Sequence, residues 1–227
     1  MKKIGLIFAI EASAVEERYG KMEELDAPKG YKLYKVVKDN AEMYILRSGM
    51  GEIYASAGAQ YLISACGVEA IINFGVVGGL TPDMKNRKIC VVSRVVNYKY
   101  DISEMLPEYK VGQMDGKDGI FIPTDPSLLA SALSIAPDLF VATDCSGDKF
   151  VGTAEEKKYL HDTFEGDICD MESAGIVLAC ELNSIPCLLF KAVSDGLADG
   201  AKGFFEELND ASLVCLRLTD EIIDKIV

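Results

Sequence analysis

The sequence lacks any apolar run of the roughly 18–20 residues that a membrane-spanning helix needs. The first apolar run, 4–10, covers only seven of the 227 residues and leads directly into Glu11. A run this short, followed by acidic residues, is typical of a buried first strand and unlike a signal peptide. We therefore expect a cytoplasmic protein without a membrane partner.

Positive charge is also scarce. The chain has 23 Lys and Arg residues against 36 Asp and Glu residues, which gives a formal net charge of −13. It contains no basic block that would offset this locally. Because such a chain repels phosphate backbones and anionic lipids, we expect neither nucleic acid nor a membrane surface as a partner.

Histidine and paired cysteines are nearly absent as well. His161 is the only histidine, and the seven cysteines are scattered without a C-x-x-C pair. A single histidine argues against a zinc site and against any mechanism that needs several histidines. Scattered cysteines of odd number favour reduced thiols over disulfides. We expect no metal and no cofactor.

What the sequence does contain is an alternation of apolar strand-like segments with helix-like segments. Strands are expected at 3–10, 31–37, 42–47, 69–74, 89–96, 138–142 and 187–193, and helices at 11–19, 52–65, 170–183 and 203–226. Turns are expected at 75–79 and 194–196. The alternation predicts an α/β sandwich with a parallel or mixed central sheet. Since no repeat or linker interrupts it, we expect a single domain over 1–227.

Reactive loops in such sheets lie beyond the carboxyl ends of the strands. Four segments place small or acidic residues there, and a helix start at 170–173 adds further polar groups; the four are 9–13, 73–80, 145–152 and 192–195. Each has a structural explanation when taken alone, because glycines make turns and acids at a helix start complement its dipole.

Five short motifs occur in order across nearly the whole chain: RSGMG (47–51), IINFGVVGGL (71–80), SGDKFV (146–151), DMESA (170–174) and AVSD (192–195). Together they resemble the signatures of the nucleoside phosphorylase/nucleosidase superfamily. The most similar branch is the methylthioadenosine/S-adenosylhomocysteine nucleosidases. The resemblance implies a three-layer sandwich with a mixed central sheet. It also implies a purine nucleoside substrate and a hydrolase that cleaves its N-glycosidic bond without a metal.

Cleavage of the bond between ribose C1′ and purine N9 requires an acid that protonates the departing base. The resemblance implies that Asp195 is this acid and that Ser194 helps to place it. It further implies that Glu172 holds the ribose hydroxyls and that Met171 lies against the sugar. Without the resemblance, Asp195 could be a turn or capping residue, and Glu172 a first-turn glutamate worth about 0.3–1 kcal/mol to its helix.

Three more residues complete the implied binding site. By resemblance Phe150 stacks on the base, and the backbone of Val151 reads the edge of the base. Val76 lies in the glycine-rich segment, where smaller or hydroxylated residues are common. On spacing alone, Phe150 could equally be a core residue.

The sequence departs from the family at the residue that activates water. In the nucleosidases a glutamate stands four residues after an alanine of the first strand, and here Ser13 stands four residues after Ala9. Serine is not a base at neutral pH, and general-base assistance is typically worth about 10²–10⁴-fold in rate. Glu11 is the nearest carboxylate, but in a helix starting at Glu11 it would point about 200° away from Ser13. A later helix start would let Glu11 reach the pocket.

Two alternatives to hydrolysis remain open. A phosphorylase needs several cations for phosphate, and Arg47 is the only arginine close to a motif. A catalytically impaired nucleoside-binding protein would explain Ser13, but it would not require the acid at Asp195. Relatives pair so that a neighbouring subunit closes the pocket, so a homodimer is expected. The irregular segment 97–119 could form that lid or pack on the core.

Overall fold

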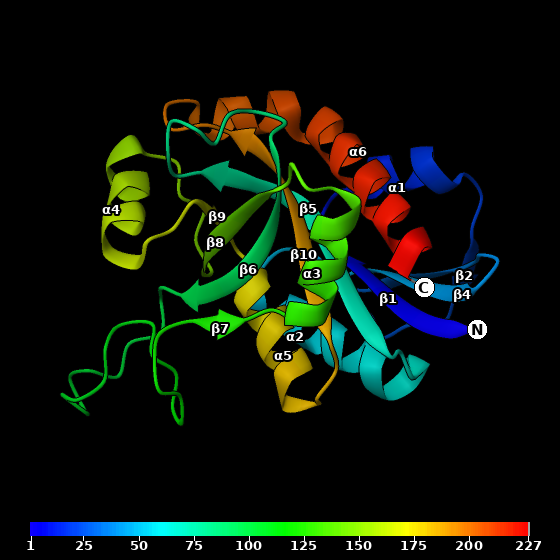
Figure 1. Cartoon of the computed structure of the whole chain (residues 1–227), viewed down its shortest axis with the longest axis horizontal. Helices are drawn as coiled ribbons and strands as arrows, with labels where there is room; N and C mark the ends of the chain where they lie inside the picture. Colours follow the sequence, from blue (N-terminus) through cyan, green and yellow to red (C-terminus); the bar gives the residue numbers. More distant parts are fainter. Residues whose placement is uncertain (227) are drawn as a thin grey trace.

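The computed structural model describes residues 1–226; Val227, the last residue of the expected domain, lies outside the described residues. A mixed ten-stranded sheet forms its centre (Figure 1). The strands are β1 (Lys2–Phe8), β2 (Glu23–Leu25), β3 (Lys32–Val37), β4 (Ala41–Arg47), β5 (Ala70–Gly79), β6 (Ile89–Asn97), β7 (Ile122–Pro123), β8 (Phe140–Ser146), β9 (Ile168–Asp170) and β10 (Cys187–Asp195).

The strand pairings close part of this sheet on itself. β10 pairs with both β5 and β6, and β8 and β9 connect β6 back to β5, so five strands form a ring. From β5 the sheet continues through β1, β4 and β3 to β2. β1, β4, β5 and β10 are mutually parallel. Their carboxyl ends therefore meet at one end of the sheet.

Helices cover both faces of the sheet. α6 (Gly200–Ile226) lies against β10 and β5, with α1 (Ala12–Tyr19) and α3 (Pro126–Ile135) beside it. α2 (Glu52–Tyr61), which continues as the π-helix η1 (Leu62–Cys66), packs with α5 (Ser173–Leu182). α4 (Ala154–Phe164) lies at the left in Figure 1. None of the helices in the described part of the chain has the length and apolar character that crossing a bilayer requires.

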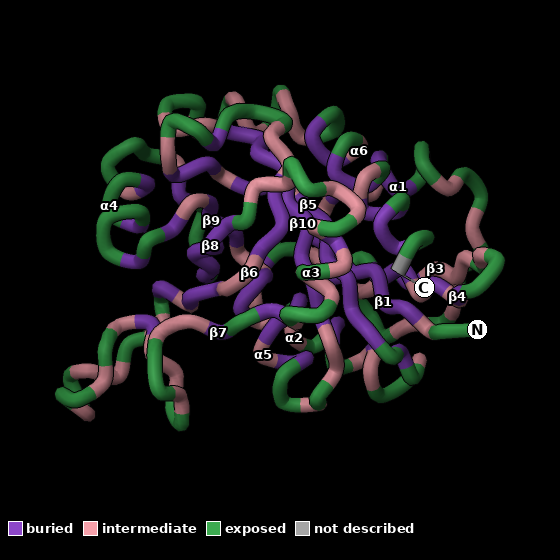
Figure 2. The backbone as a smooth tube through the Cα atoms, viewed as in Figure 1, coloured by how far each residue is buried: buried purple, intermediate pink, exposed green. Residues whose placement is uncertain are grey.

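The first strand shows how the sequence divides the core in two. Alternate residues of a strand point to opposite faces. Ile7 joins the apolar cluster under α2 and α5, whereas Leu6 and Phe8 join the cluster under α6. The near-continuous apolar run is thus required because both faces of β1 are covered, and Figure 2 shows the central strands as buried. The predicted α/β class with a mixed sheet is confirmed.

Two segments expected as turns belong to strands. The glycine-rich segment 75–79 continues β5, and Ser194 and Asp195 end β10. A side chain on Gly79 would bring its Cβ within 2.5 Å of the carbonyl oxygen of Met84. Glycine is needed here because another part of the backbone lies close to the strand, and not because the chain turns.

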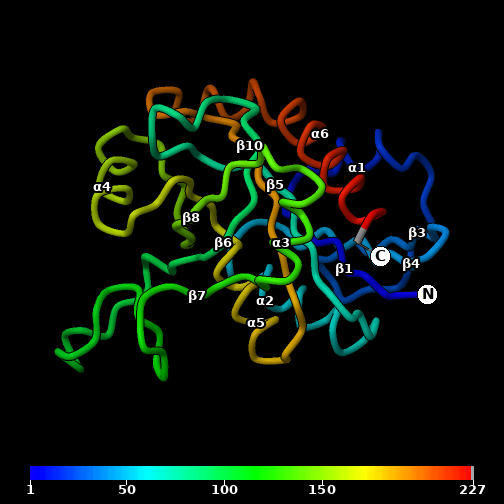
Figure 3. Tube along the Cα trace, in the orientation of Figure 1, coloured from blue at the N-terminus to red at the C-terminus, as the bar shows by residue number. Residues whose placement is uncertain are grey.

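The segment 98–121 contains neither helix nor strand, as expected for 97–119. In Figure 3 it extends away from the sheet between β6 and β7. Its base is anchored, since Tyr98, Val111 and Phe121 pack with the apolar cluster that contains Leu160 and Phe164.

The contact between α2 and α5 depends on Gly175. A Cβ at this position would lie 2.6 Å from the carbonyl oxygen of Glu52. We expect Gly175→Ala to destabilise the protein by about 1–3 kcal/mol, because backbone overlap outweighs the roughly 0.5–1 kcal/mol gained in helix propensity. Urea unfolding of Gly119→Ala is the control, since a Cβ at Gly119 meets nothing within 4 Å. Equal stability of the two variants would contradict this packing argument.

Candidate active site

A cavity of about 370 Å³ opens at the end of the sheet where β5, β9 and β10 meet. It is lined by seven of the eight residues proposed from the sequence: Glu11, Val76, Phe150, Val151, Met171, Glu172 and Asp195. The eighth, Ser194, is fully buried behind Asp195. These residues come from segments more than 180 positions apart in the chain, and the fold brings them around one hollow.

Glu11 enters the cavity because α1 starts one residue later than expected. Ala12 is the first helical residue, so Glu11 occupies the N-cap position and its side chain does not follow the helix. Its carboxylate accepts hydrogen bonds from the backbone N–H groups of Ala9 (3.1 Å), Ile10 (2.8 Å) and Val76 (3.1 Å). The group is 5% exposed. Three donors fix it as an oriented hydrogen-bond acceptor.

Ser13, which stands four residues after Ala9 where the nucleosidases have a glutamate, does not face the cavity. It lies on the exposed side of α1, outside the cavity lining. The expected helix start at Glu11 was wrong by one residue, because Glu11 is the N-cap of α1. With Glu11 at the N-cap, the two residues point to different places, and the carboxylate is the one that faces the cavity.

Asp195 lies at the cavity wall as the last residue of β10 and is 1% exposed. The hydroxyl of Ser194 lies 3.0 Å from its Oδ1 and 3.2 Å from the carbonyl oxygen of Val77, so it can donate to either. The ammonium group of Lys157 donates to Oδ2 at 2.6 Å. Burial raises the pKa of Asp195, the Lys157 charge opposes this, and the resulting pKa lies above its usual value.

Glu172 occupies the N-cap position of α5, with its carboxylate turned to the cavity. Oε1 accepts a hydrogen bond from the backbone N–H of Gly51 at 2.8 Å, and this contact joins the RSGMG and DMESA segments. Burial, and then the negative charge of Asp170, raise the pKa of Glu172 to about 8. The raised pKa favours the protonated form of this side chain at neutral pH.

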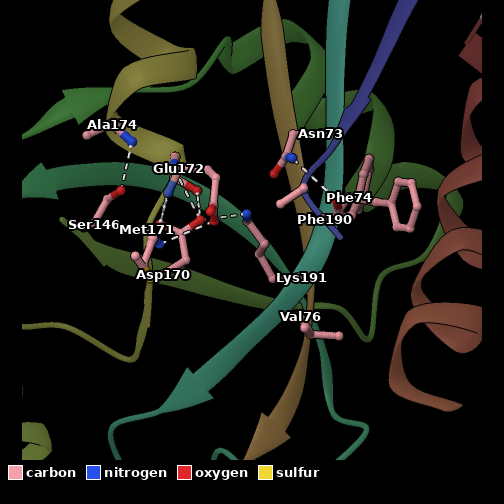
Figure 4. A network of polar contacts seen from close by, with 12 residues as sticks. Asn73, Phe74, Val76, Ser146, Asp170, Met171, Glu172, Ala174, Phe190 and Lys191 are labelled. Atoms are coloured by element: carbon pink, nitrogen blue, oxygen red, sulfur yellow. Dashed lines mark hydrogen bonds and ion pairs between the residues drawn. The ribbon is translucent and has the colours of Figure 1, made fainter. Parts of the chain in front are cut away.

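Behind Glu172 lies a buried ion pair (Figure 4). The ammonium group of Lys191 donates to Oδ2 of Asp170 at 2.7 Å, and neither side chain is more than 2% exposed. Burial acts to raise the pKa of Asp170, but the Lys191 charge and the Ser173 hydroxyl hold it below its usual range. Lys191 thus balances the buried negative charge of Asp170.

Phe150 lies at the rim of the cavity and not in the core. It is 41% exposed, and its ring meets that of Phe204 edge-to-face at 5.7 Å. Phe204 and Phe205, from the first turns of α6, also line the cavity. The core-packing alternative for Phe150 is therefore wrong. Aromatic rings at this rim can cover a flat heterocycle.

Lys157 and Phe204 belong to the site, although neither was proposed from the sequence. Lys157 carried a usable signal, because it lies on the same side of α4 as Leu160 and Phe164, both of which are buried. A lysine on the apolar face of a helix needs a buried partner. That partner, Asp195, could not be identified before the fold was known.

The cavity contains two carboxyl groups with raised pKa values, Asp195 and Glu172, and the oriented carboxylate of Glu11. Asp195 can donate to a base, Glu172 can bind vicinal hydroxyls, and Glu11 can accept a proton from water. Lys149 is the only cation among the described residues that line the cavity. Arg47 is exposed and lies outside this lining.

Comparison with known proteins gives consistent matches. The chain is 29% identical over 218 residues to an aminodeoxyfutalosine nucleosidase of Helicobacter pylori, covering 93% of this chain and 94% of that protein. It is 29% identical over 172 residues to a 5′-methylthioadenosine/S-adenosylhomocysteine nucleosidase of Shewanella piezotolerans, covering 73% and 74%. A mutant Helicobacter pylori MTAN, solved with 5′-methylthioadenosine in the active site, superposes with a TM-score of 0.92 at 27% identity over 99% of both chains.

The model of the phosphorylase superfamily matches residues 3–227, almost the full length of the sequence. The match includes every segment that contributes to the cavity, from the end of β1 to the start of α6. The chain therefore belongs to the phosphorylase superfamily.

Proposed function

We propose that the chain is a nucleosidase that hydrolyses the N-glycosidic bond of a purine nucleoside such as methylthioadenosine or S-adenosylhomocysteine. The observation that carries this proposal is the convergence of Asp195, Glu172 and Glu11 on one cavity with an aromatic rim. Nucleosidases among the relatives and a superposable structure with 5′-methylthioadenosine in its active site support the same activity.

Asp195 acts as the general acid. A purine leaves its sugar readily once a ring nitrogen is protonated, and the raised pKa of Asp195 favours its proton-bearing form. Ser194 orients the carboxyl group from behind. Phe150 covers the base, and Val151, which is buried at the cavity wall, offers its backbone to the edge of the base.

Glu172 binds the ribose hydroxyls, with Met171 against the sugar. As the glycosidic bond breaks, the sugar gains positive charge beside the carboxyl oxygens of Glu172. These oxygens stabilise the oxocarbenium-like transition state more than the uncharged ground state.

Glu11 activates the attacking water. Its three backbone donors hold the carboxylate in a fixed orientation, which suits a base that must be in place before the sugar cation forms. The argument for a catalytically impaired binding protein rested on Ser13, and Glu11 supplies the group that Ser13 lacks. Phosphorolysis has little support, because several cations are needed to hold phosphate.

A homodimer of single-domain, three-layered subunits in the cytoplasm completes the proposal. Four apolar residues are more than half exposed. Met50 and Phe205 line the cavity, and Ile53 and Tyr54 lie in the first turn of α2. A second copy would cover such a patch and narrow the mouth of the pocket. The segment 97–119 is the proposed lid or interface segment. Two apolar clusters on opposite faces of the sheet favour the three-layered arrangement.

Release of free base tests the activity directly. The protein is incubated with methylthioadenosine, S-adenosylhomocysteine, adenosine and inosine, each with and without phosphate. We expect release of the purine without phosphate. Release only with phosphate would instead identify a phosphorylase, and tight binding without release would identify a binding protein.

Asp195→Asn removes the acidic proton while keeping the size of the side chain. We expect loss of turnover with ligand affinity within about tenfold, or about 1.4 kcal/mol, because binding does not require proton transfer. Single-turnover assays and calorimetric titration measure the two effects. A fully active variant would exclude Asp195 as the acid.

Glu11→Gln tests the base. We expect kcat to fall by about 10²–10⁴-fold, since the amide keeps the shape but cannot accept the proton of water. Ser13→Ala is the matched control two residues away and should retain wild-type kcat, because Ser13 is exposed. The opposite ranking of the two variants would return the catalytic position to Ser13.

Glu172→Gln should alter how stability depends on pH. Because the folded pKa of Glu172 is about 8 and its ordinary value is 4.5, the unfolded chain loses this proton between these pH values while the folded protein keeps it. Wild-type stability therefore falls as pH rises through this window. Glutamine does not titrate.

We expect Glu172→Gln to gain on the order of 3–5 kcal/mol relative to wild type between about pH 5 and about pH 8.5, from about 1.4 kcal/mol per pKa unit. Urea unfolding at the two pH values measures this difference. A difference that is the same at both would show that Glu172 is ionised in the folded protein throughout.

A further inference from the structure

Lys157 reaches Asp195 from α4, and its residue is fully buried. Its ammonium group donates to Oδ2 of Asp195 at 2.6 Å, to the carbonyl oxygen of Asp195 at 3.1 Å and to the carbonyl oxygen of Gly196 at 2.7 Å. An ammonium group has three N–H donors, so all of them are occupied.

This arrangement separates Lys157 from the substrate. Asp195 lines the cavity, whereas Lys157 lies behind it, outside the lining. With every N–H in use at the end of β10, the ammonium group has none left for a base or a sugar. Any effect of Lys157 on the reaction must therefore pass through Asp195.

The glycine-rich part of β5 is shaped around this pair. A Cβ on Gly78 would lie 3.3 Å from Oδ2 of Asp195, 3.5 Å from Nζ of Lys157 and 3.0 Å from Sγ of Cys169. Contacts this close leave little room for a larger residue. Residues of β5 and β9 thus pack closely around the ion pair that Lys157 of α4 forms with Asp195.

We propose that Lys157 is a positioning residue for Asp195: its ammonium group fixes the carboxyl at the cavity wall and sets the upper pH limit of the reaction. The inference rests on the proposed function, since Asp195 has an upper pH limit to set only if it donates a proton.

The direction of the effect follows from the groups that face Asp195. Lys157 from α4 favours the ionised carboxylate, as does the hydroxyl of Ser194 in β10. Burial and the like charge of Asp199, which follows β10, favour the protonated form. The thiol of Cys169 in β9 is neutral, because burial raises its pKa. Lys157 is the only cation in this set, so its removal raises the pKa of Asp195.

The test compares Lys157→Met with Lys158→Met. Lys158 is the next residue of α4, but its side chain is 72% exposed and pairs with Asp162 at the surface. Base release is followed across pH for wild type and both variants. In Lys157→Met we expect a lower kcat, an alkaline limit raised by about one pH unit or more, and KM within about threefold. Lys158→Met should follow the wild-type profile.

Lys157→Arg covers the case in which the apolar variant does not fold. It keeps the charge, so its alkaline limit should stay with that of wild type even if kcat falls. An alkaline limit that does not move in folded Lys157→Met, or that moves in Lys157→Arg, would overturn the proposal. A purely structural role would lower kcat equally at every pH.

An activity-independent measurement separates this inference from the proposed function. NMR titration of the ¹³C-labelled Asp195 carboxyl, assigned with Asp195→Asn, should show a higher pKa in Lys157→Met than in wild type. If wild type releases no base, the proposed function fails, and the titration still decides whether Lys157 controls the charge of Asp195. An unchanged titration would refute the role of Lys157 in either case.

Discussion

Negative charge has to be kept inside the protein where β5, β9 and β10 meet, and the arrangement of the site follows from how each carboxyl group is balanced. Asp195 and Asp170 each have a buried lysine, Lys157 and Lys191. Glu11 instead receives three backbone N–H groups. Removing one partner of a buried ion pair typically lowers stability by about 3–5 kcal/mol, because the remaining charge is buried without a partner. Each lysine and its aspartate are therefore needed together. Glu172 forms no ion pair among the described residues, and its raised pKa favours the protonated, uncharged form.

Much of the fold could be predicted because it depends on apolar periodicity. The continuous apolar residues of β1 and the strands β3 and β4 lie where the sequence placed them. The glycine-rich part of β5 was misjudged because glycine serves turns and close contacts alike, and only the fold shows that Met84 lies against Gly79. Helix α3 was missed although its start was signalled, since Asp125 caps it ahead of a proline in the first turn.

For the site, the ordered motifs led to residues around one cavity, but they could not give the directions of side chains. Whether Glu11 faces the cavity depends on a helix that starts at Ala12, and a shift of one residue changes that direction by about 100°. No local sequence signal distinguishes the two starts. Lys157 required even more of the fold, because its partner lies 38 residues away in β10. The motifs therefore identify the reacting groups more easily than the residues that control their charge.

The same concentration of carboxyl groups bears on the choice between water and phosphate. Asp144 is fully buried beside Asp170, and neither of its oxygens has a hydrogen-bond partner among the described residues. Burial and the Asp170 charge raise its pKa well above its usual value, so a further negative charge is unfavourable in this region. A phosphate dianion entering this region would meet the carboxylate of Glu11, with Lys149 as the sole cation of the described lining. A sugar that becomes positive would be stabilised by the same groups. Water carries no charge and meets no such repulsion. Because Lys157 and Lys191 are already paired with Asp195 and Asp170, neither is available to bind phosphate, and the site favours hydrolysis.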